Sequence, residues 1–468
     1  MSLNDFIFFQ NTDRQYQYPK KFAYKNAFGL FLIISSAITI PYAAAMGSRP
    51  TEVILETAPA VQLPPLTLEE AYQAALHRSE ELAMAQADID MTWANFLEAS
   101  SEALGDVSYQ REDFRQEDLG SGTSESGATS SFNRPNTRES KFVISQPLFQ
   151  GFKSLGALAG SGSLRKEREY TYDRAKQLLF LDVADVFYTV QRYERDLEIT
   201  QETLKLLGSR VNDLNKREEI GRSRMSEVVT ARARLNSLKS TLARIQGSMR
   251  VQKRTLEFLT GYNLEGRSLA DPENVPQMTS PITGYLEQSE NRPDVEAARY
   301  ALKKANQNII IAQSEVWPTI TLDHTQYDRR EGFQGPIDWD MMFKINVPLF
   351  QGGEALSKIK AALVDRTKSN LKLTQTERVS EMETKQAYDS LSSRLDEYTA
   401  LEEAVKTAEE NYKVQKKDYR LALVTNLDVL EALENLNQTR LDHNEVHAEL
   451  LKDYRRLQVA SGDCCESI

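Results

Sequence analysis

The hexapeptide QPLFQG occupies residues 146–151, and VPLFQG occupies residues 347–352. Each copy joins a proline, which cannot donate to a strand ladder, to a glycine, which permits a sharp change of backbone direction. The two copies lie 201 residues apart. We therefore expect Pro147 and Pro348 to end strands, and Gly151 and Gly352 to let the chain turn into helices.

The spacing of 201 residues persists beyond these hexapeptides. It aligns SEVVTA at 226–231 with LDVLEA at 427–432, and a closing glycine, Gly261, with Gly462. Upstream, SSEALGDVSY at 100–109 corresponds to QSEVWPTITL at 313–322 with a different spacing. Similarity that keeps one offset over such a length predicts an internal duplication. The repeats would span residues 66–261 and 291–462, joined by a linker over 262–290 and followed by a tail over 463–468.

Composition narrows the class of protein. The 468 residues carry a formal net charge of -11, which argues against a nucleic-acid partner. No proline lies between Pro147 and Pro272, and none follows Pro348. Such stretches, rich in good helix formers, favour very long helices. The two cysteines, Cys464 and Cys465, are adjacent and cannot build a disulfide framework, so they predict an unstructured tail or, alternatively, a crosslink between chains.

The amino-terminal residues have the features of a signal peptide. Lys20, Lys21 and Lys25 precede an apolar run over 27–40, and PYAAAM follows at 41–46. This order predicts a signal peptide over residues 1–45, cleaved after Ala45, and then a linker over 46–65. An uncleaved membrane anchor is the alternative. No other run approaches the ~18 apolar residues that a membrane helix requires.

Within each repeat, a helix gives way to strands. Residues 66–104 show helical periodicity, with Thr67 as N-cap, and Gly105 should end this helix; the counterpart over 294–317 should end at Pro318. Alternating apolar residues then predict four strands of about ten residues, two in each repeat. The polar, Gly- and Ser-rich residues 116–140 predict a long exposed loop.

Two long helical hairpins should follow the strands. Each begins after a glycine, runs about sixty residues as a coiled coil, reverses near Gly221 or Ala422, and returns to a closing glycine. Four strands leave unpaired edges, and their length suits a tilted strand of a membrane barrel. The fold class is thus a mixed α/β membrane protein, mainly α, and a homotrimer would supply the twelve strands of a shared barrel.

The chain resembles the TolC family of outer-membrane efflux proteins, or outer-membrane factors. The resemblance lies in the two hexapeptides, in SEVWPTITL, in YRLALVTNLDVLEALENLN at 419–437 and in the closing glycines. It implies a trimeric outer-membrane barrel continuous with an α-helical periplasmic tunnel in a Gram-negative bacterium. It also implies two protein partners, namely a periplasmic adaptor (membrane fusion) protein and an inner-membrane transporter, either a proton-driven pump or an ABC transporter. Outer-membrane lipid would surround the barrel.

That resemblance implies an export channel serving efflux or type I secretion. A periplasmic coiled-coil scaffold or adaptor without channel activity is the alternative. No nucleophile, phosphate-binding loop or acid–base motif is present in the sequence, so we expect neither an enzyme nor a cofactor. His443 and His447 have a spacing that suits a metal, but no third ligand is evident, and we expect surface histidines.

The candidate site lies near the second reversal. Asp428 and Glu431 fall on one helical face, and the resemblance matches them to carboxylates that ring the closed periplasmic entrance. An ordinary solvated coiled-coil face is the alternative for both. The resemblance also matches Tyr419 to a position that helps to hold the entrance shut. Ala422 replaces the usual glycine there, and Val424 stands where some members have arginine.

The equivalent tip of the first repeat carries a different set of charges. Arg222, Arg224 and Glu227 lie there, close to the first reversal. We expect Arg222 or Arg224 to pair with carboxylates at the entrance.

Overall fold

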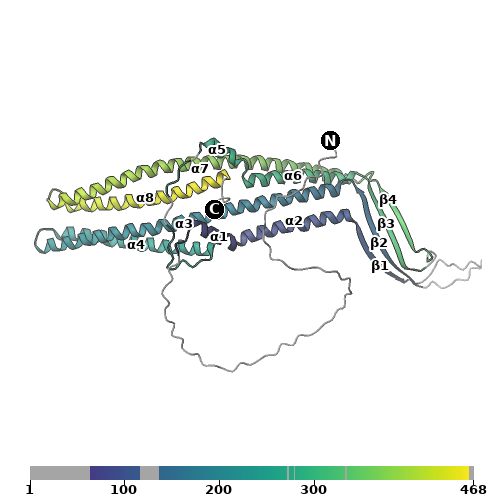
Figure 1. Ribbon diagram of the computed structural model, residues 1–468, viewed down its shortest axis with the longest axis horizontal. Helices are drawn as coiled ribbons and strands as arrows, with labels where there is room; N and C mark the ends of the chain where they lie inside the picture. Colours follow the sequence, from purple (N-terminus) through teal and green to yellow (C-terminus); the bar gives the residue numbers. More distant parts are fainter. Residues whose placement is uncertain are drawn as a thin grey trace, which may run out of the picture. The chain divides into compact units, whose positions relative to one another are not determined.

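Two helical hairpins of equal dimensions dominate the computed structural model (Figure 1). The outgoing helices, α3 (Lys153–Glu219) and α7 (Glu354–Arg420), have 67 residues each. The returning helices, α4 (Met225–Thr260) and α8 (Asn426–Ser461), have 36 residues each. At 1.5 Å per residue the outgoing helices are about 100 Å long. The predicted long hairpins are confirmed, and the bounds of one hairpin are those of the other shifted by 201 residues.

The structure describes residues 64–115, 117, 136–270, 274–278, 280–331 and 335–462. The expected signal peptide, the two cysteines, and most of the expected loop over 116–140 therefore lie outside the described residues. The last five residues of that loop, 136–140, belong to a strand instead.

The hairpins reverse where the sequence predicts. Gly221 has a φ of 68° and Ala422 a φ of 60°, so both adopt the left-handed conformation at corresponding places. The conformation is open to glycine, whereas it costs an alanine roughly 1–2 kcal/mol. Ala422 therefore adopts the turn geometry of the glycine it replaces, against its intrinsic preference.

The upstream helices differ from expectation in one respect. The helix expected over 66–104 is divided into α1 (Leu68–Arg78) and α2 (Glu80–Leu104). Ser79 has extended backbone angles, and its hydroxyl accepts a hydrogen bond from the Leu82 amide at 3.3 Å. The expectation of one helix was wrong, because this serine caps a new helix and helical periodicity alone does not show the break.

The second repeat has the same order of helices. Helix α5 (Ile282–Ser289) precedes α6 (Pro293–Gln313), and a 3-10 turn, η1 (Ser314–Val316), follows. Helix α5 lies within residues 262–290, which we expected to be a plain linker, and its Tyr285 is buried in a cluster with Leu391, Leu450 and Leu457. Pro318 stands between the 3-10 turn and the next strand, so the α-helix itself ends earlier than predicted.

Four strands form one antiparallel sheet, as predicted. They are β1 (Asp106–Arg115), β2 (Asn136–Gln150), β3 (Thr319–Arg330) and β4 (Trp339–Asn346), in the order β1-β2-β3-β4. Helices pack in the matching order, α2 on α3, α3 on α6, and α6 on α7. Within the described part of the chain, β1 and β4 are thus edge strands.

The junction residues lie between these layers. Gly105 ends α2 with a φ of 81°, and a Cβ there would approach the Ser145 carbonyl oxygen to 2.4 Å. At Gly151, a Cβ would lie 2.6 Å from the Trp317 Cβ, so glycine is required at both places. Gly352 shares the φ of Gly151, 61°.

The role expected for Pro147 was wrong. Strand β2 continues past this residue to Gln150, with a register shift between Pro147 and Phe149. The irregularity accommodates a residue that cannot donate to the ladder. Pro348, in contrast, follows the end of β4 at Asn346.

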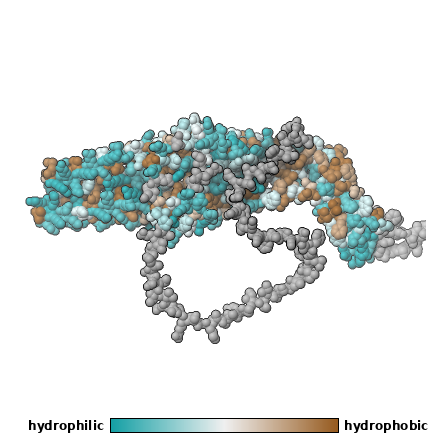
Figure 2. Space-filling view, in the orientation of Figure 1, coloured by the Kyte–Doolittle hydropathy of each residue, from teal (hydrophilic) through white to brown (hydrophobic). Residues whose placement is uncertain are grey.

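The two faces of the sheet differ in chemistry. One is polar; there Ser145 donates a hydrogen bond to Asp323 at 2.6 Å, and Tyr327 donates one to Asp340 at 2.8 Å. The other is apolar, and its side chains have exposed fractions of 43% to 68%; they are Val107, Tyr109, Phe142, Ile144, Trp339, Met341, Phe343 and Ile345. Figure 2 shows hydrophobic residues gathered where strands meet helices, and hydrophilic residues at the far end of the sheet. Among the described residues, no helix combines the length and the apolar character needed to cross a membrane.

Candidate entrance at the hairpin tips

The two hairpin tips pack on each other within one chain. A buried apolar cluster joins them, with Leu207, Val211, Leu214, Val228 and Ala231 from the first hairpin and Leu430 and Leu433 from the second. The turns of both hairpins lie at the same end, away from the sheet (Figure 1). The predicted tip residues of both repeats are therefore brought together.

Asp428 belongs to the helix cap of α8. The Thr425 hydroxyl accepts a hydrogen bond from the Asp428 amide at 3.4 Å. In return, Asp428 Oδ2 accepts one from the Thr425 amide and one from the Thr425 hydroxyl, each at 2.7 Å. These bonds from Thr425 lower the pKa of Asp428. The carboxylate is thus kept ionised and oriented by its own helix, a role that the sequence analysis did not consider.

Glu431 lies one turn further along α8 and is exposed. In the first hairpin, Glu227 occupies the position equivalent to Asp428, and its Oε2 accepts a hydrogen bond from the Ser223 hydroxyl at 2.6 Å. Arg224 is the N-cap residue of α4, and the Arg222 amide donates to the Arg217 carbonyl at 2.7 Å. Neither Arg222 nor Arg224 forms an ion pair within the part of the chain that the structure describes. Their expected pairing with carboxylates of the entrance thus remains a prediction.

Tyr419 is held by arginines of the first hairpin. The Arg210 guanidinium carbon lies 3.7 Å from the centroid of the Tyr419 ring, and that of Arg217 lies 5.0 Å away. Arg210 Nε also donates to Oδ1 of Asn426, a buried residue, at 2.9 Å. Burial lowers the pKa of Arg210, although an arginine stays charged. Arg210 therefore connects α3 to both helices of the second hairpin.

Sequence reasoning missed Arg210 and Asn426. Arg210 lies far from Tyr419 in the sequence, and neither arginine nor asparagine departs from the ordinary composition of a coiled-coil surface. In the sequence Asn426 is marked only by its place directly after Thr425, the cap of α8, and its burial is seen only in the structure.

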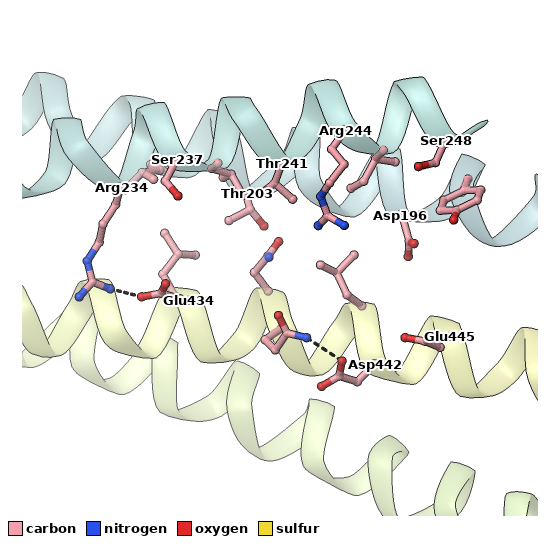
Figure 3. A pocket seen from close by; sticks show the side chains of 18 of the residues that line it. Asp196, Thr203, Arg234, Ser237, Thr241, Arg244, Ser248, Glu434, Asp442 and Glu445 are labelled. Carbon is pink, nitrogen blue, oxygen red and sulfur yellow. Dashed lines mark hydrogen bonds and ion pairs between the residues drawn. The ribbon is translucent and has the colours of Figure 1, made fainter. Parts of the chain in front are cut away.

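A groove lies above the tips, between α3, α4 and α8, with a volume of about 480 Å³ (Figure 3). An ion pair between Arg234 and Glu434 crosses it. Further along, Gln438 donates to Asp442 at 2.7 Å. Asp196 also lines the groove, and its burial raises its pKa. The lining is mixed: charged and hydroxylated side chains share it with five leucines and Ile245.

The histidines of α8 pack against an aromatic ring. The Tyr398 ring centroid lies 4.8 Å from that of His443 and 5.6 Å from that of His447. Burial lowers the pKa of His443. No group of three metal-ligating side chains occurs among the described residues. Both histidines are partly exposed, and in addition their rings pack against α7, a contact that the sequence did not indicate.

Comparisons with known proteins agree with this architecture. The family model described as "Outer membrane efflux protein" matches residues 71–262 and 286–463. The chain is 25% identical over 390 residues to the probable efflux pump outer membrane protein TtgC of Pseudomonas putida, covering 79% of this chain and 77% of that one. It is 22% identical over 334 residues to the outer membrane protein TolC of Vibrio cholerae, covering 69% and 76%.

Solved structures show the same fold. The structure of CusC superposes with a TM-score of 0.74 at 20% identity, covering 84% of this chain and 92% of that chain. The structure of VceC from Vibrio cholerae gives a TM-score of 0.73 at 21% identity, covering 84% and 96%. Since the family model matches most of the sequence, the chain belongs to the outer membrane efflux protein family, the TolC family that its sequence resembles.

Proposed function

We propose that three copies of this chain form one conduit, with a twelve-stranded outer-membrane barrel continuous with a helical periplasmic tunnel. The chain is an outer-membrane channel component of an efflux system, as its family indicates, and a periplasmic scaffold or adaptor is not favoured. The observation that supports the shared barrel best is a sheet with two edge strands and one exposed apolar face. Sheet edges inside a membrane must be paired, because lipid offers no hydrogen bonds.

The helical layer supports the same assembly. Exposed apolar residues follow α2 at Met84, Met91, Leu97 and Leu104, and follow α7 at Leu356, Leu363 and Leu371. Met84 and Met91, Leu97 and Leu104, and Leu356 and Leu363 are each seven residues apart, as in a coiled-coil seam, whereas Met91 and Leu97 are separated by six. Helices α2 and α7 are the two outer helices of the layer, so the exposed apolar residues on α2 of one copy can pack on those of α7 in the next copy. Such a head-to-tail contact closes into a ring.

The recurring element bounds support an internal duplication. Because equivalent hairpins recur within each chain, a trimer would present six similar hairpins around the tunnel. We place the repeats at 66–261 and 291–462 and the linker at 262–290. Helix α5, at the end of that linker, precedes α6 as α1 precedes α2.

At the entrance, we propose that Asp428 and Glu431 of three chains form a ring of carboxylates. The exposure of Glu431, the partial exposure of Asp428 and the cap that keeps Asp428 ionised support this arrangement. A ring of six carboxylates would favour cations over anions. Tyr419, held by Arg210, would keep each second hairpin against the first and hold the ring narrow.

The tips also suit a protein partner. Leu421 and Leu423 have exposed fractions of 61% and 71%, and Ile220 and Met225 are exposed at the other turn. Exposed apolar residues gathered at one end mark a docking surface. We propose the periplasmic adaptor as its occupant and, beyond it, an inner-membrane transporter. Relatives are named for cargoes as different as toluene and cations, so we assign cargo selection to the transporter.

The test combines assembly and conduction. The mature protein, purified in detergent, should have the mass of a homotrimer and should produce discrete conductance steps in planar bilayers. A stable monomer would contradict the shared barrel. Recovery in the periplasmic fraction without detergent would favour the scaffold.

A further inference from the structure

We propose that arginines at the outer end of the sheet bind the phosphate groups of an outer-leaflet glycolipid, lipopolysaccharide. The inference rests on the proposed barrel, in which the apolar face of the sheet meets lipid. It concerns a different part of the molecule. The exposed apolar side chains on that face form an apolar band across the sheet, and the residues in question lie just beyond this band.

An aromatic row marks the outer limit of that band. Tyr109 pairs with Phe142, Phe142 with Gln326, and Gln326 with Trp339, so one register row carries three aromatic rings. The rings of Tyr109 and Phe142 lie 4.9 Å apart. Aromatic girdles of this kind stand at the level of the lipid headgroups in outer-membrane barrels.

The thickness of the band agrees with a membrane. At the helical end of the sheet, Trp317 and Phe152 form an edge-to-face pair with ring centroids 5.9 Å apart. From Trp317 to the row of Gln326, nine residues of extended chain cover about 30 Å, or about 23 Å across the membrane at a tilt of ~40°. This is close to the ~25 Å apolar band of such barrels.

The next row outward is cationic. Arg111 pairs with Ser140, and Ser140 pairs with Arg329. Since Arg111 lies two residues beyond Tyr109, its side chain points to the same side as the girdle. On β3, the register shift between Ser140 and Lys141 inserts one extra residue, Asp328. This shift places Arg329 on the apolar side and its neighbour Arg330 on the polar side.

A second row extends the cluster. Arg138 pairs with Asp113, and its Nε lies 3.5 Å from an Asp113 oxygen. Arg115 ends β1 on the same side. We call Arg111, Arg115, Arg138 and Arg329 the rim arginines.

The rim arginines are available to a ligand. The side chains of Arg111, Arg138 and Arg329 have exposed fractions of 60%, 50% and 54%. Two carboxylates interleave with them; Asp113 contacts Arg111 and Arg138, and Glu331 accepts hydrogen bonds from Arg329 at 2.6 and 3.0 Å. Even with the exposed Asp328 of the bulge counted beside these two carboxylates, four cations against three anions leave a positive surplus, and each guanidinium has five N–H donors. Planar guanidinium groups bind phosphate oxygens in bidentate fashion.

The position of the rim arginines next to the apolar band indicates what kind of ligand they bind. Acyl chains would cover the apolar band, while the phosphates of the same molecule would lie one row above the aromatic girdle. A phosphorylated glycolipid fits both surfaces, whereas free phosphate uses only the cationic one. Basic clusters at a membrane surface recognise anionic lipid headgroups in this way.

The experiment uses the trimer reconstituted in phosphatidylcholine nanodiscs. Bisphosphorylated lipid A, the same lipid without phosphates, and millimolar inorganic phosphate are the probes, and native mass spectrometry counts the retained lipid. The variant Arg111→Gln/Arg138→Gln/Arg329→Gln should bind lipid A at least about tenfold more weakly. The matched control is Arg330→Gln, which removes one charge at the same depth from the opposite face and should bind as the wild type does.

A second variant keeps the test decisive if the first fails to assemble. Asp113→Asn/Glu331→Gln removes the competing carboxylates and should tighten lipid A binding. Equal binding of the dephosphorylated lipid, displacement by inorganic phosphate, or unchanged binding in both variants would overturn the inference. A wild-type protein that is trimeric and conducts but shows no phosphate dependence would refute this inference alone. A protein that does not insert would refute the proposed barrel.

Discussion

Replacing Arg210 should loosen the entrance. Near the tip, this residue joins α3 to both helices of the second hairpin, through the Tyr419 ring at 3.7 Å and Asn426 at 2.9 Å. A charge-assisted hydrogen bond contributes about 1.5–3 kcal/mol, and a cation–π contact about 0.5–2 kcal/mol. The two are partly exposed, so we take a combined value near the middle, about 3 kcal/mol per chain.

A change of this size is large for a conformational equilibrium. Since about 1.4 kcal/mol corresponds to a factor of ten, Arg210→Gln should shift the closed–open equilibrium about 100-fold toward open. A tip that is open for roughly 0.1% of the time would then be open for about 10%. The assay is single-channel recording of trimers in planar bilayers, which measures open probability and conductance directly.

Conservative variants separate the two contacts. Tyr419→Phe keeps the aromatic face and should behave as the wild type, because the Tyr419 hydroxyl makes no hydrogen bond within the described chain. Tyr419→Leu should open the tip, and the double variant with Arg210→Gln should show non-additive effects. Arg217→Gln removes the more distant cation–π contact and should give a smaller shift than Arg210→Gln. Wild-type open probability in a trimeric Arg210→Gln protein, or equal effects of Phe and Leu at Tyr419, would refute the reasoning.

Three further predictions concern the same hairpins. Asp428→Asn together with Glu431→Gln should weaken cation preference and reduce block by multivalent cations from the periplasmic side, and unchanged selectivity in bilayers would mark both as ordinary surface charges. Ala422→Gly should stabilise the turn by up to about 1 kcal/mol, whereas Gly221→Ala should destabilise its turn by a similar amount, as measured by thermal unfolding; the two effects should not share a sign. Because burial lowers the pKa of His443, the folded state binds fewer protons there than the unfolded state, so stability present above pH 6.5 should fall as the pH drops below it. His443→Gln should flatten that part of the stability–pH curve, and an unchanged curve would contradict the assignment.

The sequence alone determined where most of the helices and strands lie. The change from helical to alternating periodicity predicted all four described strands, since side-chain direction in each element depends only on near neighbours. Gly221 and Ala422 were predicted as reversal points because matching phrases surround them at one spacing. The break at Ser79 and helix α5 were not predicted from the sequence, because a serine cap and a short helix leave no periodic pattern to detect.

Only the tertiary structure decided which distant residues meet. Arg210 contacts Tyr419 because two hairpins lie side by side at a particular rotation, and that rotation is set by the whole buried cluster between them. Asp428 proved to be a cap ligand through the orientation of Thr425, a matter of side-chain geometry. Arg329 shares the apolar side of the sheet with Arg111 because a one-residue irregularity in strand pairing exchanges the faces of β3. Sequence patterns report the period of a single strand, whereas the register between strands is decided when the sheet forms.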